Sequence, residues 1–587
     1  MTLAGVGLMN GLHLIPTPGM PWESGKEGGQ MPKFGRTGSL ILLWVCLSVL
    51  IYSSSCLAET LGRSVSDMRF GGTYRRALAN NPATLDPAFV SDIYSRTVVT
   101  QISKGLVQFD AHLNPIPAIA EFWEASRDGR IWTFTLRQGV QFHHGREVTA
   151  QDFVYSLARL LSPKALGPVT DFLRRIQGAD EFIAGTATTV HGLRAIDRYT
   201  LQFALKEPFA PSLTVLGLAN AAVVPQEEVE RLGDRFAQAP VGAGPFKLVR
   251  WEPGKQIILE AYEHYYEGRP FLDTVVFKIG GTFEKTFARF LAGNLDEAII
   301  PSGKTQEVHN DPRYRQYQLL RRPTLGLLFI GFNTQLKPFD DKRVRQAFNY
   351  GVDKEAIVRK ITQMGSLPAN GVLPPGMPGH DPDLQGYSYD PTKAKQLLAE
   401  AGYPNGAGFP VVHLWTVSKA ESTKAELAAY QRYLAELGVQ MDIHFIDEWT
   451  RYTEMLQRGE LQMFRYAWYA DLPDPDNFFF PLLHPTGQSN YMHYQNRHVD
   501  RLLERARVEL DYAQRVMLYR EAERLVMEDA PWITQHNHNF EYLYQPHVQG
   551  VEVSLLGDRW IPMNKIWLKR TPIEASTGTA SNVKTVR

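Results

Sequence analysis

The order of the predicted strands and helices restricts the fold of this chain more than any other feature of its sequence. In "IWTFTL" (131–136), Trp132, Phe134 and Leu136 fall on one face, a period of two that is typical of a half-buried strand. The same pattern recurs at 199–205, 255–262 and 273–279. The first half of the chain is therefore predicted to be rich in strands.

Helices concentrate in the second half. "YDPTKAKQLLAEAGYP" has Asp390 as a helix cap, Pro391 at the first helical position and Gly402 at the end. Further helices are predicted within 340–361, with a restart at Asp353, and within 499–526, as two helices meeting near Asp511. The strand-like segment "WITQHNHNFEYLY" (532–544) follows them. A mixed α/β protein is expected. If the last strands return to the first half of the chain, the protein would have two lobes between which the chain crosses more than once.

The length and the charge balance limit the possible functions. A chain of 587 residues is too long for one compact core, so two or three domains are expected. Lysine plus arginine and aspartate plus glutamate number 62 each, so there is no basic excess to attract nucleic acid. Nucleic acid is not an expected partner.

An apolar run near the N-terminus predicts export. Lys33 and Arg36 precede "LILLWVCLSVLIY" (40–52), which is followed by small residues. Such a run is too short to span a bilayer but suits the hydrophobic region of an export signal, and a buried helix is the alternative. The signal is expected to start at Met31, with Met1 as the other candidate start, and the protein is expected to be periplasmic.

The two cysteines of the chain, Cys46 and Cys56, both lie in this segment. Cleavage after Ala58 would leave a mature protein without cysteine, which needs no disulfide after export. Lipidation of Cys56 is the alternative, and it would anchor the protein to a membrane surface.

Common catalytic and cofactor motifs are missing from the sequence. The nucleophile elbow G-x-S-x-G, the zinc helix H-E-x-x-H, the phosphate loop G-x-x-x-x-G-K-[ST] and the dinucleotide motif G-x-G-x-x-G do not occur. The histidine pairs 143–144 and 536–538 have no third ligand close in sequence, so structural or surface histidines are expected. No cofactor and no metal site is predicted.

The stretch "WYADLPDPDNFF" (468–479) contains three aspartates beside aromatic residues. A hydrolase would have to use Asp471, Asp474 and Asp476 as acid and base. A calcium loop starting at Asp474 would need glycine and glutamate at its sixth and twelfth positions, which are Phe479 and Pro485. Asp474 and Asp476 are instead expected to cap the following turn or to face solvent.

Six segments together resemble one protein family. They are "ATLDPAF" (83–89), "WTFTLRQGVQFHHGREVTAQDFVYSLAR" (132–159), "GAGPFKLVRWEPG" (242–254), "PFDDKRVRQAFNYGVDKEAIV" (338–358), "AKQLLAEAGYP" (394–404) and the aspartate-rich stretch above. In this order they resemble the extracytoplasmic solute-binding proteins, family 5, that serve ABC importers of oligopeptides, dipeptides and nickel. The resemblance runs from about Gly71 to Leu568.

The resemblance implies an α/β fold of two lobes, the type II-like periplasmic-binding-protein fold. An extra subdomain is expected to be inserted in lobe I. The expected parts are an extension and export signal at 1–58, lobe I at 65–108, 221–280 and 539–571, the inserted subdomain at 109–220, lobe II at 281–538, and a disordered tail at 572–587. A ligand would lie between the lobes, which close about a hinge. The closed form would be recognised by membrane permease subunits, and a monomer is expected.

In similar peptide-binding proteins a Trp-x-x-Asp element meets the N-terminus of the ligand, and Trp468 and Asp471 match it. A buried ammonium is costly unless it is paired, and a fixed carboxylate offsets that cost. Pro473 and Pro475 stiffen the loop, so less order is lost on binding. The alternative is that Asp471 only caps a helix or loop.

Three other positions match the family less closely. Arg465 corresponds to an arginine that meets the carboxylate of some ligands, with a surface salt bridge as the alternative. Trp449 corresponds to an aromatic wall of a side-chain pocket, with a buried core tryptophan as the alternative. "VSDIY" (90–94), with Ser91 and Asp92, falls where an extended edge would pair with the peptide backbone.

One departure concerns a glycine-rich turn. Relatives commonly have G-T-G-P-Y where this chain has Gly242-Ala243-Gly244-Pro245-Phe246, so a ligand hydrogen bond is expected to be lost. The sequence thus predicts a non-catalytic receptor that delivers short peptides to an ABC importer. The alternatives are the same fold binding a nickel complex, haem, an oligosaccharide or an opine-like compound, a chaperone-like or signalling role of the same cleft, and a secreted hydrolase.

Overall fold

The computed structural model describes residues 69–570, except 163, 164, 166, 167, 363–365, 553, 558 and 559. The predicted export signal, Cys46, Cys56, the cleavage after Ala58 and the tail lie outside the described residues. Within the described ranges, no helix is both long enough and apolar enough to cross a membrane.

The first sheet is built from segments far apart in the sequence. Its four strands follow the order β1 (Thr73–Leu78), β10 (Thr274–Ile279), β9 (Gln256–Ala261) and β8 (Phe246–Glu252). β1 pairs with β10 in parallel, and the other neighbours are antiparallel. Alternate residues such as Val275 and Phe277 are buried and belong to the same hydrophobic cluster as residues of helix α2 (Ile93–Ile102). The strands predicted within 255–262 and 273–279 are confirmed.

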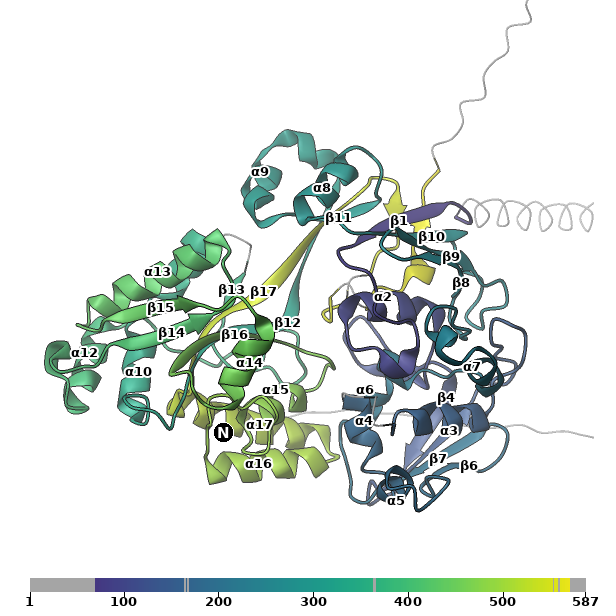
Figure 1. Ribbon diagram of the computed structural model, residues 1–587, viewed down its shortest axis with the longest axis horizontal. Coiled ribbons are helices and arrows are strands. Elements are labelled where there is room, and N and C mark those ends of the chain that lie inside the picture. Colours follow the sequence, from purple (N-terminus) through teal and green to yellow (C-terminus); the bar gives the residue numbers. More distant parts are fainter. Residues whose placement is uncertain are drawn as a thin grey trace, which may run out of the picture. The chain divides into compact units, whose positions relative to one another are not determined.

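A second, antiparallel sheet lies between β1 and β8 in the sequence. Its order is β4 (Ala120–Ala125), β5 (Ile131–Leu136), β7 (Thr200–Ala204) and β6 (Leu193–Ala195). Trp132, Phe134 and Leu136 are all buried on one face, as predicted, because alternate residues of a strand point the same way. Helix α3 (Ala150–Arg159) contributes Phe153 to the same cluster, and α3 lies beside this sheet (Figure 1).

The largest sheet contains the predicted C-terminal strand. Its strands follow the order β11 (Glu297–Ile299), β17 (Trp532–Tyr544), β12 (Gln318–Phe332), β16 (Met463–Tyr469), β14 (Val412–Thr416) and β15 (Met441–Phe445), and β13 (Leu367–Pro368) also pairs with β17. The long antiparallel strands β12 and β17 extend from β16 to β11 (Figure 1). At that end Tyr542 and Tyr544 pack in the cluster of the first sheet, and the Asp296 amide donates to the Arg75 carbonyl at 2.9 Å. The return of the last strands to the first half is confirmed.

The predicted helices of the second half are also present. They are α10 (Lys342–Tyr350), α11 (Lys354–Ile357), α12 (Pro391–Glu400), α16 (Arg497–Val508) and α17 (Tyr512–Asp529). The Asp390 side chain caps α12 by accepting from the Lys393 amide, and Asp511 caps α17 by accepting from the Gln514 amide. Gly402 follows α12 with a φ of 99°, in the left-handed region that favours glycine.

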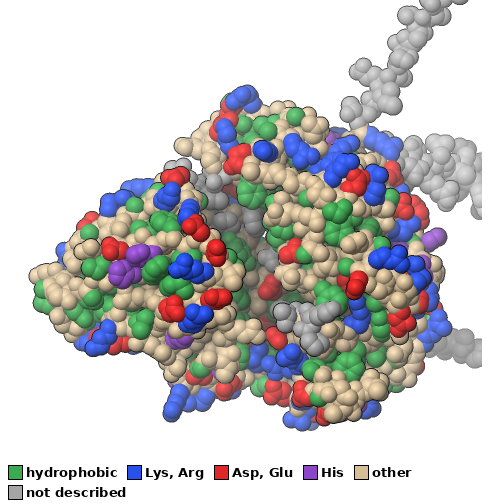
Figure 2. All heavy atoms as spheres, in the orientation of Figure 1, with side chains coloured by type: hydrophobic (Ala, Val, Ile, Leu, Met, Phe, Trp, Pro, Cys, Tyr) green, Lys and Arg blue, Asp and Glu red, His purple; other side chains and the backbone are tan. Residues whose placement is uncertain are grey.

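The other α-helices and strands of the described structure lie between and after these elements. They are α4 (Pro168–Leu173), α5 (Ala179–Ile183), α6 (Ser212–Leu216), α7 (Gln226–Leu232), α8 (Phe283–Leu291), α9 (Thr305–Asn310), α13 (Glu421–Ala435), α14 (Trp449–Gln457), α15 (Asp476–Leu483), β2 (Val107–Phe109), β3 (Pro115–Pro117), β18 (Val548–Gln549) and β19 (Trp567–Leu568). Basic and acidic side chains are interspersed over the face shown in Figure 2, in keeping with their equal numbers.

Candidate ligand-binding site

The loop between β16 and α15 carries Asp471 and Asp474 of the aspartate-rich stretch, and the third aspartate, Asp476, is the first residue of α15. Asn477, in the first turn of α15, holds the start of this loop, since its side-chain oxygen accepts from the Asp471 amide at 2.8 Å. Its carbonyl oxygen accepts from Nε1 of Trp468 at 2.7 Å. The tryptophan ring and the Asp471 backbone are therefore fixed by one residue, six positions after the aspartate.

Asp474 and Asp476 anchor the loop in the protein. The Asp474 carboxylate accepts two hydrogen bonds from Arg515, at 2.6 and 2.8 Å, and Asp476 pairs with Arg507 at 3.0 Å. Burial raises the pKa of the Asp476 carboxyl, and Arg507 opposes that rise. The expectation that these carboxylates cap the following turn or face solvent is confirmed for Asp474, which is buried but accepts from the Asp476 amide. It is wrong for Asp476, which is buried and pairs with Arg507. An acid and base pair built from them would have no open access to a substrate.

Asp471 differs from the other two aspartates of the loop. Its side chain is 38% exposed, and Oδ1 lies 3.2 Å from Nη1 of Arg96, a residue of α2. This contact is an ion pair with a side chain of another element. Of the three carboxylates, Asp471 is the one that a ligand could reach.

Aromatic rings form a surface beside this loop. Trp449, the first residue of α14, is 54% exposed, so the alternative of a buried core tryptophan is wrong. Its ring stacks on Tyr466 of β16, with centroids 5.8 Å apart and planes 28° apart, and Tyr466 meets the edge of Tyr491 at 5.4 Å. We call Trp449, Tyr466 and Tyr491 the aromatic surface. Tyr466 and Trp468 occupy alternate positions of β16 and both pack on the same hydrophobic cluster.

Arg465 belongs to a buried polar group. Its Nη2 lies 3.2 Å from Oε2 of Glu426 on α13, and the Gln535 side-chain amide donates to the other Glu426 oxygen at 2.8 Å. Burial raises the pKa of Glu426, and the charge of Arg465 opposes that rise. The alternative of a surface salt bridge is wrong, because Glu426 is buried and the arginine side chain is only 13% exposed.

The segment around Ser91 and Asp92 leads into a helix. The Asp92 carboxylate accepts from the amides of Tyr94 and Ser95, at 2.9 and 2.8 Å, so Asp92 is the N-cap of α2. Ile93 and Tyr94 are helical, so the expectation of an extended edge is wrong for these two residues, whereas Val90 and Asp92 have extended backbone. Aspartate is a favoured N-cap because its oxygens satisfy amides that have no partner within the helix. Ser91, just before the cap, is exposed.

The glycine-rich turn packs against the end of α2. The Gly244 amide donates to the Ile102 carbonyl at 2.8 Å, and a Cβ at Gly242 would collide with that same carbonyl oxygen. Ala243 is buried in the cluster of the second sheet, and the expected loss of a ligand hydrogen bond at this position stays a prediction. His143 bonds to both glycines and is structural, since burial lowers its pKa to about 4 and keeps it neutral.

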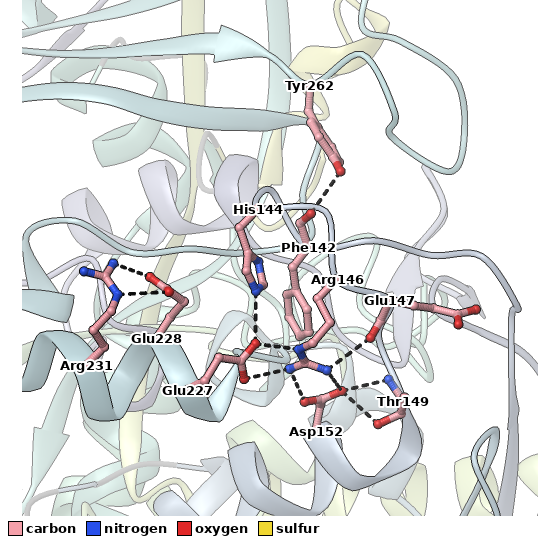
Figure 3. Close-up of polar contacts among 10 residues, drawn as sticks. All are labelled: Phe142, His144, Arg146, Glu147, Thr149, Asp152, Glu227, Glu228, Arg231 and Tyr262. Atoms are coloured by element: carbon pink, nitrogen blue, oxygen red, sulfur yellow. Dashed lines mark hydrogen bonds and ion pairs between the residues drawn. The ribbon is translucent and has the colours of Figure 1, made fainter.

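A charged network joins α3 to α7, and the sequence analysis did not identify it. Arg146 donates to Asp152 at 2.6 Å and to Glu227 at 3.0 Å, and the His144 ring contacts Glu227 at 3.0 Å (Figure 3). Partial burial would raise the pKa of Glu227, but the hydrogen bonds from Arg146, its own backbone amide and His144, with the charge of Arg146, together lower that pKa to about 2. The network holds the segment before α3 in place, and the motif segment "FHHGREVTAQD" is thus structural.

Comparison with protein families gives a single clear assignment. The family model described as "Bacterial extracellular solute-binding proteins, family 5 Middle" matches residues 114–490. The chain belongs to this family. The matched range of this solute-binding protein includes the aspartate-rich loop, Trp449 and Arg465, but not Ser91 or Asp92.

Individual relatives of this family 5 protein cover most of its length. Heme-binding protein A of Haemophilus influenzae is 32% identical, over 89% of this chain and 98% of that protein. The dipeptide-binding protein of Escherichia coli is 31% identical, over 89% and 97%. The periplasmic binding protein DppA from Helicobacter pylori, solved in complex with the peptide STSA, has a TM-score of 0.69 and 26% identity, over 86% and 100%. The family 5 protein has the two-lobed α/β fold that its sequence predicts.

Proposed function

We propose that the protein is an exported, non-catalytic receptor that binds short peptides between its lobes and delivers them to the permease subunits of an ABC importer. The observation that carries this proposal is the accessible carboxylate of Asp471, held at the start of a rigid loop beside an aromatic surface. A fixed carboxylate offsets the cost of burying a ligand ammonium. The names of relatives that bind dipeptides or were solved with a peptide support the same ligand class.

The proposed lobe boundaries agree with the sheets. Lobe I, at 65–108, 221–280 and 539–571, would contain the first sheet, and the inserted subdomain at 109–220 would contain the second. Lobe II, at 281–538, would contain most of the largest sheet. The strands β12 and β17 would then run through the hinge, because each packs at one end with the first sheet.

The proposed ligand contacts follow from the accessible side chains. Asp471 would bind the ligand ammonium, and Trp468 would stay oriented by its bond to Asn477. Trp449 would offer an exposed ring to a ligand side chain. Two ligand contacts remain predictions from the sequence: Ser91, which is exposed before α2, and Arg465, which pairs with Glu426. The Asp92 carboxylate caps α2.

A non-peptide ligand is the second candidate, since one relative is named for haem binding. Native mass spectrometry of the mature protein, purified without added ligand and then denatured, separates the two. A heterogeneous set of short peptides is expected, at one per monomer. A haem, metal complex or sugar mass would keep the fold and reject the peptide assignment, and turnover of added peptides would reject the non-catalytic part.

The same experiment addresses export and anchoring. The intact mass of the protein recovered from the periplasm is expected to match a polypeptide that begins directly after Ala58. A mass that includes a lipid on Cys56 would instead show membrane anchoring, with the ligand assignment unchanged.

A further inference from the structure

The ion pair between Arg96 and Asp471 joins two separately built parts of the molecule. Arg96 lies in the first turn of α2, which packs in the cluster of the first sheet. Asp471 follows β16 of the largest sheet, 375 positions later in the sequence. The arginine side chain is only 10% exposed, so its charge is largely withdrawn from water.

The hydrogen bonding of Arg96 is sparse for a buried arginine. Within the described part of the chain, its side chain makes one hydrogen bond, from Nη1 to Oδ1 of Asp471 at 3.2 Å. Arg159 and Arg515, which also pair with aspartates, each make two carboxylate bonds, at 2.6 and 3.1 Å and at 2.6 and 2.8 Å. A guanidinium has donors on each of its nitrogens, and among the described residues no Arg96 nitrogen is both fully buried and unpaired, so its remaining donors are open to solvent or to a ligand. Arg96 is therefore placed to take a further acceptor.

The chemistry of a peptide terminus supplies that acceptor. The first carbonyl oxygen of a peptide is separated from its ammonium by only the Cα and the carbonyl carbon. An ammonium bound to Asp471 therefore brings this oxygen close to the guanidinium that already contacts the same carboxylate. A carboxylate has several acceptor positions, so Asp471 can contact both cations.

We infer that Arg96 is a specificity-determining residue that donates a hydrogen bond to the first carbonyl oxygen of the ligand while Asp471 binds the ammonium. The two side chains then select an α-aminoacyl end over a simple amine. This inference rests on the proposed function, because it assumes a ligand ammonium at Asp471.

Substitution of single atoms in the ligand tests the inference. The probes are trialanine, trialanine with the first carbonyl oxygen replaced by sulfur, and trialanine with the second replaced, each titrated by calorimetry. Sulfur is a poor hydrogen-bond acceptor, so the first replacement is expected to weaken binding to the unaltered protein by about tenfold, the loss of roughly one hydrogen bond to a charged group. In Arg96→Gln this penalty is expected to fall to about twofold or less, while the penalty at the second carbonyl stays unchanged.

Controls separate this role from a general effect of charge or stability. Arg159→Gln removes another arginine that pairs with an aspartate, Asp86, and is expected to keep the full penalty at the first carbonyl. Arg96→Lys keeps the charge with a single donor group and is expected to give an intermediate penalty. If Arg96→Gln does not fold, the lysine variant and the titrations of the unaltered protein decide the matter.

The possible failures are distinguishable. An unaltered protein that binds the three probes equally, or an Arg96→Gln variant that keeps the full first-carbonyl penalty, would overturn the role of Arg96 and leave the peptide receptor intact. A protein that binds none of the probes and releases no peptide in the mass spectrum would overturn the proposed function itself.

Discussion

The loop between β16 and α15 has an aspartate near each end, and the two aspartates have opposite environments. At the far end Asp474 is buried and receives two hydrogen bonds from Arg515, whereas at the near end Asp471 is 38% exposed and lies 3.2 Å from Arg96. A buried carboxylate that pairs with an arginine fixes the backbone, whereas an accessible carboxylate can be reached by a ligand. The degree of exposure therefore separates the anchor from the candidate binding residue.

Removal of the anchor is expected to have the largest effect. Asp474→Ala leaves the buried Arg515 charge without its carboxylate, which should lower the free energy of unfolding by about 3–5 kcal/mol. Urea denaturation measures this loss. Asp447→Ala, which breaks the exposed ion pair with Lys419, is the control and should change stability by less than about 1 kcal/mol. Equal losses in the two variants would show that Asp474 is no anchor.

Substitution at the other end of the loop should affect binding instead of stability. Asp471→Ala is expected to abolish measurable peptide binding, a loss of roughly 2–5 kcal/mol in binding free energy. The free energy of unfolding should stay within about 1–2 kcal/mol of the parent, because Asp471 is 38% exposed and no Arg96 nitrogen is both fully buried and unpaired, so water can replace the lost carboxylate. Calorimetric titration with trialanine and thermal melts measure the two quantities, and Asp471→Asn tests whether the charge itself is needed. Unchanged affinity would remove Asp471 from the site.

Glu523 is a buried acid that, within the described residues, accepts no hydrogen bond from an arginine. Glu523 of α17 accepts hydrogen bonds from the Val372 and Leu373 amides, at 2.7 and 3.0 Å. Burial raises its pKa to about 7, although these amides oppose the rise. The folded state thus holds a proton that the unfolded state has released above pH 4.5 or so, and this contribution to stability is lost as the pH rises toward 7.

Glu523→Gln tests this origin of the pH dependence. The unaltered protein should lose roughly 3 kcal/mol of this contribution between about pH 4.5 and 7, and the variant should lack that part of the slope. Denaturation curves at several pH values measure the difference, with Glu421→Gln, an exposed glutamate, as the control. An identical slope in the unaltered protein and in Glu523→Gln would show that Glu523 ionises normally in the folded state.

Local structure could be predicted from the sequence, whereas partners distant in the sequence could not. The strands at 131–136 and 532–544 and the Asp390 cap depend on neighbouring residues, so periodicity and capping identify them. The Asp474 pair joins residues 41 positions apart and the Asp471 pair joins residues 375 apart, and no local pattern encodes either. Hence Asp471 could be nominated from its motif, but not its contact with Arg96.

The segment 90–94 was predicted from the family resemblance and not from its local pattern. Asp92 has the extended backbone that the resemblance implies, but an aspartate directly before an apolar helical run is also a capping pattern, and it marks the helix that begins at Ile93. Trp449 was left undecided for a different reason, since an amphipathic helix does not reveal which end lies against a neighbouring strand. Its exposure became evident only from the packing of α14 on Tyr466.

The smallest expected effect is that of removing the Trp449 ring. It tests whether ligand recognition depends on the aromatic surface as well as on the loop that carries Asp471. Trp449→Ala removes an exposed ring that stacks on Tyr466, so the free energy of unfolding should change by about 0.5–1 kcal/mol. The binding free energy of a peptide with an aromatic side chain should weaken by roughly 0.5–1.5 kcal/mol. Tyr512→Ala is a matched control, because Tyr512 is also the first residue of a helix and is 60% exposed. If both variants bind like the parent, then ligand recognition depends on the charges of Asp471 and Arg96, with the aromatic surface outside the site. A loss confined to Trp449→Ala would place the ligand side chain on that surface, next to the carboxylate that holds its ammonium.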